Sequence, residues 1–339
     1  MGTVSIGQLI LESDQLLPEV ELAYERVGKS SAPAVLVCHA LTGDQYAVGT
    51  ADQPGWWAGL IGPGKAVDTE QFQVITFNVL GGCNGSTGPL SINPETGKPY
   101  RGTFPELTIR DMVKAERKAL ELLGVDHLTA VIGGSLGGMK TLEWARLYQE
   151  FLDTAITLAV TPYYGDYGVA FNHIGIQAIE NDPEFQAGDY PAGIRLKGFE
   201  IARMAGMVTY RSSRLFNGRF GRARGDEAFE VQSYLDYQGR KLAGRFDPNS
   251  YLTLLKAMNT HDVGDAELSA ELLSISYSHD LLYPGELMIP WVENQPNAKW
   301  KAIETDFGHD GFLVEFEKWG HHVQDQLHKS VNAKSHVLA

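Results

Sequence analysis

The sequence contains few cysteines, no excess of basic residues and no long apolar run. Its 339 residues include only Cys38 and Cys83, with no CxxC motif and no Cys/His spacing typical of a zinc site. This pattern argues against a disulfide framework and against a metal centre, and it favours a reducing compartment. The formal net charge of −14 argues against a duplex nucleic-acid binder, which needs a basic surface.

No segment approaches the roughly 18 consecutive apolar residues that a membrane-spanning helix requires. The first twenty residues contain Glu12, Asp14 and Glu19, and this acidic content is not that of a secretory signal peptide. We therefore expect a cytoplasmic protein that acts on small molecules, without a membrane or nucleic-acid partner. With 43% hydrophobic residues, a chain of this length can bury the core of a large α/β domain.

Short β-branched and aliphatic segments alternate with helix-compatible segments over the first half of the chain. The strand-like segments are residues 34–38, 73–78, 129–132 and 154–160. Before the third of them, Thr108 is a candidate N-cap for a helix that would end near Gly124. Such alternation predicts a mostly parallel central sheet flanked by helices.

The composition changes between residues 161 and 264, where strand-like runs are missing and tyrosine, arginine and helix-forming residues are common. Strand-like runs return at residues 272–277 and 299–303. We therefore predict a core domain built from residues 1–160 and 265–339, with residues 161–264 inserted as a helical lid.

A basic stretch lies inside the predicted lid. Residues 195–224 contain eight lysines or arginines and a single acidic residue, Glu200. One interpretation is a solvated or subunit-contacting helix face. The other is a binding site for an anionic ligand, such as a carboxylate or the phosphates of a carrier cofactor.

Residues 133–137 read Gly-Gly-Ser-Leu-Gly and match the Gly-x-Ser-x-Gly pattern of a nucleophile elbow. The pattern lies between the predicted strand 129–132 and a helix-forming segment that starts at Met139. This context places the Ser135 hydroxyl on a sharp turn at the positive end of a helix, where the N–H of Leu136 can stabilise an oxyanion. The alternative is an ordinary glycine-rich turn, or a phosphate-binding turn of the Rossmann type.

A serine hydroxyl is a weak nucleophile, so it needs a histidine base and an acid that orients this base. Where a nucleophile elbow is present, the acid and then the histidine follow the serine along the chain. Asp280 and His309 each follow one of the last two strand-like runs, so we expect both at the carboxyl edge of the sheet, beside Ser135. Glu286 is the nearest rival acid, and the other histidines precede Asp280 or lie on the predicted terminal helix or tail.

The second donor of the oxyanion hole is expected in the loop after the strand 34–38. The N–H of Leu41 is the candidate in this loop. We interpret His39, two residues earlier, as a residue that holds the loop by hydrogen bonding rather than one that takes part in the chemistry.

Six motifs in the same order along the chain carry a resemblance to a known family. They are His39-Ala40-Leu41-Thr42-Gly43, Pro54-Gly55-Trp56-Trp57, Gly85-Ser86-Thr87-Gly88-Pro89, Phe104-Pro105 with Thr108-Ile109-Arg110-Asp111-Met112, Gly133-Gly134-Ser135-Leu136-Gly137-Gly138-Met139 and Gly308-His309-Asp310-Gly311-Phe312. Over nearly its whole length the sequence resembles the homoserine O-acetyltransferase family. The resemblance implies the α/β-hydrolase fold and no metal or bound cofactor.

The resemblance also implies a reaction. The acetyl group of the co-substrate acetyl-CoA would pass to the hydroxyl of L-homoserine, early in methionine biosynthesis, by a ping-pong route through acetyl-Ser135. Arg203 would bind the α-carboxylate of homoserine with Tyr210 beside it, and Asp310 would hold the α-amino group, because a zwitterionic substrate needs one fixed cation and one fixed anion. A homodimer joined through the lids is the family's assembly.

Several alternatives stay open at this point. The same triad could serve a hydrolase that acts on an ester or a lactone. Related enzymes use succinyl-CoA as the donor, and some acylate serine, so a homoserine or serine O-succinyltransferase is also compatible with the sequence. A non-catalytic binding protein on this fold would require a broken triad, and the sequence shows an intact one.

Overall fold

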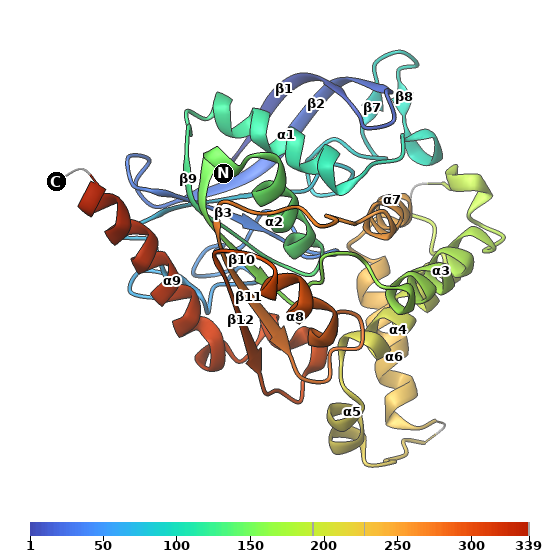
Figure 1. The fold of residues 1–339 in the computed structure, drawn as a ribbon. Helices are drawn as coiled ribbons and strands as arrows, with labels where there is room; N and C mark the ends of the chain where they lie inside the picture. Colours follow the sequence, from blue (N-terminus) through green and yellow to red (C-terminus); the bar gives the residue numbers. More distant parts are fainter. Residues whose placement is uncertain (192, 227, 338–339) are drawn as a thin grey trace.

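The computed structural model describes residues 1–191, 193–226 and 228–337, and a large sheet runs through its centre (Figure 1). The eight strands of this sheet lie in the order β1-β2-β6-β3-β9-β10-β11-β12. From β6 to β12 in this order, neighbouring strands are parallel, whereas β1 and β2 are antiparallel at one edge. The predicted mostly parallel sheet is therefore confirmed.

The strands of the central sheet are β1 (Gly2–Ile10), β2 (Leu16–Val27), β3 (Ala34–Cys38), β6 (Gln73–Phe77), β9 (Leu128–Gly134), β10 (Leu152–Leu158), β11 (Glu271–Tyr277) and β12 (Ala298–Ile303). The last six have bounds close to the predicted ones, whereas β1 and β2 were not predicted. Two small ladders pair β4 (Ile61–Gly62) with β5 (Val67–Asp68) and β7 (Ile92–Asn93) with β8 (Lys98–Pro99). The expected end of the fourth strand at Val160 is wrong, because Ala159 adopts a φ of 47° and ends β10.

Helices cover both faces of the sheet. The helices α1 (Ile109–Leu122), α2 (Leu136–Leu147) and α8 (Gly285–Glu293) pack on one face, and α9 (Phe316–Val337) packs on the other. Side chains alternate between the two cores along each strand, so that Leu36 belongs to the first core while Val35 and Val37 belong to the second. Within the described ranges, no helix has the length and apolar character needed to cross a membrane.

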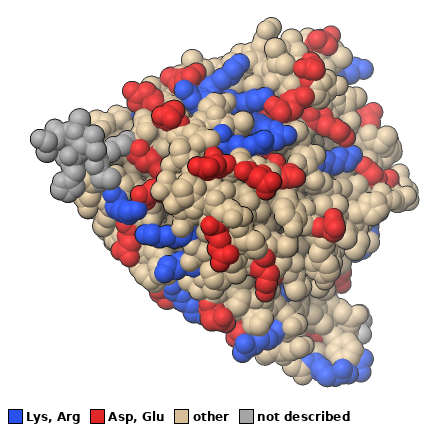
Figure 2. All heavy atoms as spheres, in the orientation of Figure 1, with Lys and Arg blue, Asp and Glu red and all other residues tan. Residues whose placement is uncertain are grey.

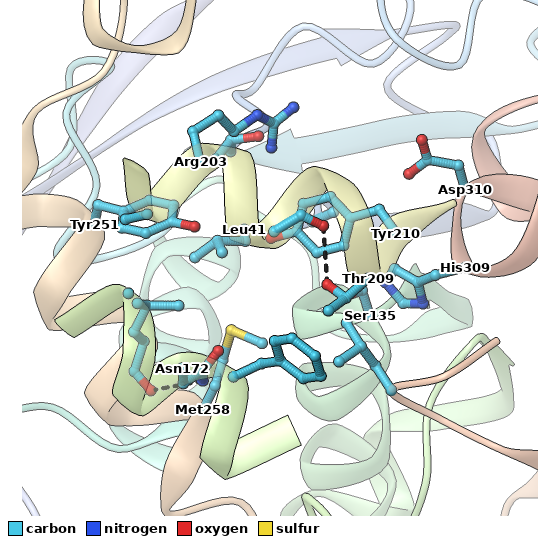
Figure 3. A pocket seen from close by; sticks show the side chains of 18 of the residues that line it. Leu41, Ser135, Asn172, Arg203, Thr209, Tyr210, Tyr251, Met258, His309 and Asp310 are labelled. Atoms are coloured by element: carbon cyan, nitrogen blue, oxygen red, sulfur yellow. Dashed lines mark hydrogen bonds between the residues drawn. The ribbon is translucent and has the colours of Figure 1, made fainter. Parts of the chain in front are cut away.

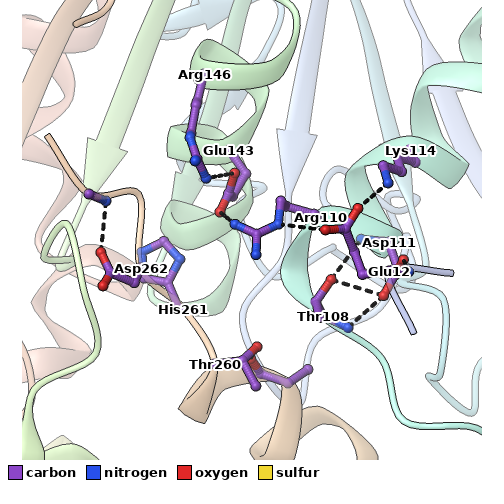
Figure 4. Close-up of polar contacts among 12 residues, drawn as sticks. Glu12, Thr108, Arg110, Asp111, Lys114, Glu143, Arg146, Thr260, His261 and Asp262 are labelled. Atoms are coloured by element: carbon purple, nitrogen blue, oxygen red, sulfur yellow. Dashed lines mark hydrogen bonds and ion pairs between the residues drawn. The ribbon is translucent and has the colours of Figure 1, made fainter. Parts of the chain in front are cut away.

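The start of α1 follows the prediction made from the sequence. Thr108 Oγ1 accepts a hydrogen bond from the Asp111 N–H at 3.2 Å, and Asp111 Oδ2 accepts one from the Thr108 N–H at 2.8 Å. Arg110 then links α1 to its neighbours, with 3.1 Å between its Nε and Glu12 and 3.5 Å between its Nη1 and Glu143 of α2 (Figure 4). Figure 2 shows basic and acidic side chains interspersed on this face of the molecule.

In the described part of the segment between β10 and β11, five helices lie beyond the carboxyl ends of these strands (Figure 1). They are α3 (Asp166–Glu180), α4 (Lys197–Tyr210), α5 (Ser213–Phe220), α6 (Glu230–Ala243) and α7 (Pro248–Asn259). The 3₁₀ turns of the described residues are Arg101–Thr103, Gln149–Phe151, Gln186–Gly188 and Gly308–Leu313. The chain leaves and re-enters the core side by side, since Tyr163 and Asp262 form an antiparallel bridge. We refer to residues 161–264 as the lid and keep the predicted bounds. Residues 192 and 227 of the predicted lid, and residues 338 and 339 of the predicted core domain, lie outside the described residues.

A charged pair is buried in the core between α1 and α2. Lys140 is fully buried, its ammonium group pairs with Glu116, and Glu116 itself is 1% exposed. Glu116 also accepts a hydrogen bond from Trp144 Nε1, at 3.1 Å from Oε2. Removing two charges from water is costly, and their mutual attraction offsets this cost only when further hydrogen bonds of this kind are present.

We expect Lys140→Met alone to lower the free energy of unfolding by about 3–5 kcal/mol, because it leaves the carboxylate of Glu116 buried and unpaired. The double variant Lys140→Met/Glu116→Met should recover most of this loss, since it removes both charges. Urea denaturation followed by circular dichroism measures both values. A double variant that is no more stable than the single one would contradict this account of the pair.

Candidate active site

Ser135 lies on a strained turn between β9 and α2. It is the N-cap of α2 and adopts a φ of 58° and a ψ of −126°, which is rare for a residue with a side chain. Its N–H donates to the carbonyl of Leu158 in β10 at 3.0 Å. A Cβ atom on Gly133 would lie 2.2 Å from the carbonyl oxygen of Gly137, so the turn excludes a side chain there.

His309 and Asp280 lie together at the carboxyl edge of the sheet. His309 Nδ1 is 2.8 Å from Asp280 Oδ2, and both side chains are almost completely buried. The other carboxylate oxygen of Asp280 accepts hydrogen bonds from the N–H groups of Leu282 and Tyr283, at 2.9 and 3.0 Å. These contacts fix the plane of the carboxylate, whereas the rival acid Glu286 lies in the first turn of α8.

The two predicted oxyanion donors adjoin Ser135. Leu136 is the first residue of α2, where backbone N–H groups have no partner inside the helix. Leu41 lies in the loop after β3 and lines the same pocket as Ser135. The two segments approach closely because Gly137 has no side chain; a Cβ atom on it would lie 2.1 Å from the carbonyl oxygen of Cys38.

His39 holds the loop that carries Leu41. Its Nδ1 lies 2.7 Å from the carbonyl oxygen of Ala40, and its Nε2 accepts a hydrogen bond from the N–H of Val79 at 3.0 Å. Burial, aided by the charge of Lys140, lowers the pKa of His39 to about 3. The imidazole is therefore neutral near pH 7, in agreement with the loop-holding role inferred from the sequence.

A pocket lies over Ser135, between the core and the lid (Figure 3). Its walls come from the loop at Leu41, from the 3₁₀ turn at His309 and from α3, α4 and α7 of the lid. The polar lining residues include Ser135, Asn172, Arg203, Thr209, Tyr210, Tyr251, His309 and Asp310, and the apolar ones include Leu41, Phe171, Leu255, Met258 and Leu282. The contributions of α3 and α7 could not be predicted from the sequence, because no spacing pattern connects them to the elbow.

Arg203 of α4 brings a positive charge to this pocket. Its guanidinium carbon lies 5.4 Å from the ring centre of Tyr210, and the Tyr210 ring lies 5.8 Å from that of His309. The Nε atom of Arg203 is buried and has no hydrogen-bond partner. A buried N–H of a cation without an acceptor is suited to bind an anionic group of a ligand.

Asp310 also lines the pocket, but it already has a partner. Arg211 Nε donates to Asp310 Oδ2 at 3.0 Å, and the Asp310 side chain is 17% exposed. The family resemblance assigns Asp310 to the α-amino group of the substrate, and no feature of the sequence predicts its pairing with Arg211. The one indication of this pair in the sequence is that Arg211 directly follows Tyr210, which was already expected at the substrate site.

The remaining residues of the basic stretch have structural partners. Arg195 and Lys197 pair with the buried Glu200, and Arg214 pairs with Asp306 at 3.3 Å. Arg219 lies over the rings of Phe220 and Tyr234, and Arg222 and Arg224 lie over the ring of Phe229. Of the eight basic residues in the stretch 195–224, Arg203 is the one that lines the pocket.

Neither a disulfide nor a metal site is formed by the described cysteines and the other side chains that could bind a metal. Cys38 is buried, Cys83 is half-buried, and both are free thiols. Burial raises the pKa of Cys38 to about 12 and that of Cys83 to about 11. In the part of the chain that the structure describes, no three His, Cys, Asp or Glu side chains gather into a group that could hold a metal ion.

Comparison with known proteins places this geometry among α/β hydrolases and acetyltransferases. Residues 33–326 match the family model of the α/β-hydrolase fold. A homoserine O-acetyltransferase of Symbiobacterium thermophilum is 44% identical, with 91% of this chain and 88% of that protein covered. The structure resembles a homoserine O-acetyltransferase of Bacillus anthracis with a TM-score of 0.90 at 25% identity, covering 96% of each chain. It resembles the esterase E22 with the same TM-score at 24% identity, over 96% of this chain and 99% of the other.

The pKa of His39 leads to a prediction on stability. Because the folded pKa of about 3 lies below the ordinary value of 6.5, the unfolded chain binds the proton first, and the free energy of unfolding falls as the pH falls from 6.5 towards 3. This single group contributes a slope of at most about 1.4 kcal/mol per pH unit. We expect His39→Gln to make the decline between pH 6 and pH 4.5 less steep.

Urea denaturation at several pH values measures this slope. The exposed His173 of α3, changed to Gln, is the matched control and should leave the slope as it is in the unchanged protein. Equal slopes for His39→Gln and the unchanged protein would show that His39 is not held neutral by burial.

Proposed function

The chain belongs to the homoserine O-acetyltransferase family of the α/β-hydrolase fold, and on that premise we propose that it transfers the acetyl group of acetyl-CoA to the hydroxyl of L-homoserine in methionine biosynthesis. The observation that carries the proposal is that Ser135, His309 and Arg203, whose Nε has no hydrogen-bond acceptor, share one pocket. Acetyl-CoA acts as a co-substrate, and no bound cofactor or metal takes part. Because acetyl-CoA is made inside the cell, a cytoplasmic location is part of the proposal.

In the first half of the reaction, Ser135 Oγ attacks the carbonyl carbon of the thioester while His309 accepts its proton. The N–H groups of Leu41 and Leu136 stabilise the oxyanion that forms. Collapse of the tetrahedral intermediate breaks the bond from carbon to sulfur, and His309 returns the proton to the departing thiolate. Asp280 keeps the imidazole oriented throughout, since its carboxylate is itself held by two backbone N–H groups.

In the second half, the homoserine hydroxyl takes the place that water would take in a hydrolase. Its proton moves to His309, its oxygen attacks the acetyl carbonyl, and Ser135 Oγ leaves with the proton that His309 returns. Arg203 binds the α-carboxylate and Tyr210 packs beside it. The free N–H of Arg203 supports its role in binding the carboxylate. The contact between the side chains of Arg203 and Tyr210 supports the position of Tyr210 beside it.

Asp310 is assigned to the α-amino group of homoserine. Its pairing with Arg211 neutralises part of its charge, so we infer that the amino group binds to an ion pair rather than to an isolated carboxylate. The oxygens of Asp310 are then oriented by Arg211 before the substrate arrives, which reduces the cost of ordering the site on binding.

Hydrolysis of an ester is the competing outcome of the same acyl-enzyme. A similar fold occurs in the esterase E22, so the fold does not distinguish the two reactions. The cation of Arg203, whose Nε is buried without an acceptor, favours the transferase, because a neutral ester would leave it without an anionic partner. An acyl donor such as succinyl-CoA and an acceptor such as L-serine are the nearest alternative substrates for this site.

We expect intact-mass spectrometry to detect one acetyl group on the protein after mixing with acetyl-CoA, and none on Ser135→Ala. Adding L-homoserine should remove the acetyl group and speed thiol release, because the acceptor replaces slow attack by water. Ser30→Ala, an exposed serine, is the matched control and should behave as the unchanged protein. Release of acetate that L-homoserine does not change would identify a hydrolase, and faster turnover with succinyl-CoA or L-serine would replace the substrates proposed here.

The lid also carries the surface through which we propose a homodimer. Tyr167 and Ile174 are seven residues apart on α3, and Ile201 and Val208 are seven residues apart on α4, so each pair lies on one helix face. All four side chains are at least 43% exposed, and α3 packs against α4. Exposed apolar side chains on two adjacent helices can be buried against the same surface of a second copy of the chain.

We therefore expect light scattering after size-exclusion chromatography to give a dimer of the 37.2 kDa chain. Ile201→Glu/Val208→Glu should give a monomer, because two carboxylates would be buried in the interface. Ile10→Glu, which changes an exposed residue of β1, is the control and should stay dimeric. A monomeric unchanged protein, or a dimeric double variant, would refute the lid interface.

A further inference from the structure

The loop that carries Leu41 makes a tight turn at residues 40–43. The N–H of Gly43 donates to the carbonyl oxygen of Ala40 at 2.9 Å, and His39 Nδ1 lies 2.7 Å from the same oxygen. Across a trans peptide bond, the C=O of one residue and the N–H of the next point in opposite directions. The two contacts that hold the carbonyl of Ala40 therefore also hold the direction of the Leu41 N–H, the predicted oxyanion donor.

A further contact holds this turn from the side of the lid. Arg245, which follows α6, donates a hydrogen bond from Nη1 to the carbonyl oxygen of Thr42 at 2.9 Å, across 203 positions of the chain. Among the described residues, this is the one hydrogen bond between the lid and residues 39–44. Leu41 and Thr42 are the two central residues of the turn, so the bond restrains the peptide next to the predicted donor.

The position of the turn matters because the pocket lies on one side of it. Leu41 and Thr42 line this pocket together with Ser135. Atoms that line a cavity have no packing on the open side, so hydrogen bonds determine where the turn lies. The bond from Arg245 is of the stronger kind, because its donor is a charged guanidinium.

We propose that Arg245 is a positioning residue for the oxyanion hole. Its hydrogen bond to Thr42 holds the turn 40–43 so that the N–H of Leu41 points at the oxyanion that forms on the acyl group of Ser135. Arg245 acts through Thr42 and exchanges no proton with the substrate. The lid thus completes the oxyanion hole in addition to binding the acceptor. The inference rests on the acetyl-Ser135 intermediate of the proposed function.

An oxyanion forms in both halves of the reaction, once when Ser135 attacks the donor and once when the acceptor attacks the acetyl ester. Loss of a positioning residue should therefore slow both halves by the same factor. An arginine that binds the phosphates of acetyl-CoA would affect the first half alone. An arginine that binds the carboxylate of L-homoserine would change the concentration at which this acceptor saturates.

Arg245→Met removes the guanidinium and keeps a long, unbranched side chain. We expect single-turnover acetylation by acetyl-CoA, acetylation by 4-nitrophenyl acetate and deacetylation by L-homoserine each to slow by about tenfold, which is part of the roughly 10²–10³-fold effect of deleting an oxyanion donor. The half-saturating concentration of L-homoserine should change by less than about twofold. Arg245→Lys keeps a charged donor and should be at least about threefold faster than Arg245→Met in each step.

Arg240→Met is the matched control. Arg240 is an exposed arginine in the last turn of α6, and its substitution should leave all three rates unchanged. Slowing confined to acetyl-CoA, or a change confined to the half-saturating concentration of L-homoserine, would overturn the proposal, as would unchanged rates in Arg245→Met. Arg245 is itself exposed, so we expect its variants to fold, and thermal unfolding checks this.

A second measurement needs no acyl donor. Methylboronic acid reacts with a serine nucleophile by forming a bond from boron to Oγ, the serine proton passes to the histidine, and the tetrahedral anion places an oxygen in the oxyanion hole. Because this adduct resembles the transition state, we expect its dissociation constant to rise about tenfold in Arg245→Met and to stay unchanged in Arg240→Met. Equal dissociation constants for Arg245→Met and the unchanged protein would refute the positioning role.

Neither methylboronic acid nor 4-nitrophenyl acetate requires L-homoserine or acetyl-CoA. A failure of the positioning role is therefore distinct from a failure of the proposed function.

Discussion

The active-site geometry depends on how closely the first turn of α2 packs against the end of β3. A side chain at Gly137 would collide with the carbonyl of Cys38, so only glycine allows this approach. The same approach places the N–H of Leu136 and the loop of Leu41 on either side of Ser135. Ser135 in turn takes a positive φ, and the hydrogen bond from its N–H to Leu158 helps to hold this conformation. Strain at the nucleophile is thus offset by the packing around it.

The pocket is completed by segments that are far apart in the chain. The lid contributes Arg203 and Tyr210, while the loops after β11 and β12 contribute Leu282 and His309. Charges in this region are arranged in pairs, and the buried N–H of Arg203 stands out because it has no acceptor. A buried donor without an acceptor selects ligands with an anion in the matching place.

A nearly identical fold serves an acetyltransferase and an esterase, so the fold alone explains neither reaction. Both reactions begin with an acyl group on serine, and they differ in what removes it. The features that matter for this choice are the position of a second substrate, for which Arg203 and Asp310 are the proposed anchors, and the groups around the departing serine oxygen. Tyr283 packs on His309, and its N–H donates to Asp280.

The sequence by itself determined the features that depend on local spacing. The elbow at Ser135, the cap at Thr108 and the alternation of helices with the central strands from β3 onwards follow from short patterns, because turns, caps and alternation are set by neighbouring residues. The tertiary structure decided the contacts between distant segments: Arg211 with Asp310, 99 residues apart, Lys140 with Glu116 and Tyr283 with His309. No spacing predicts such contacts, because they depend on how the lid and the loops pack onto the sheet.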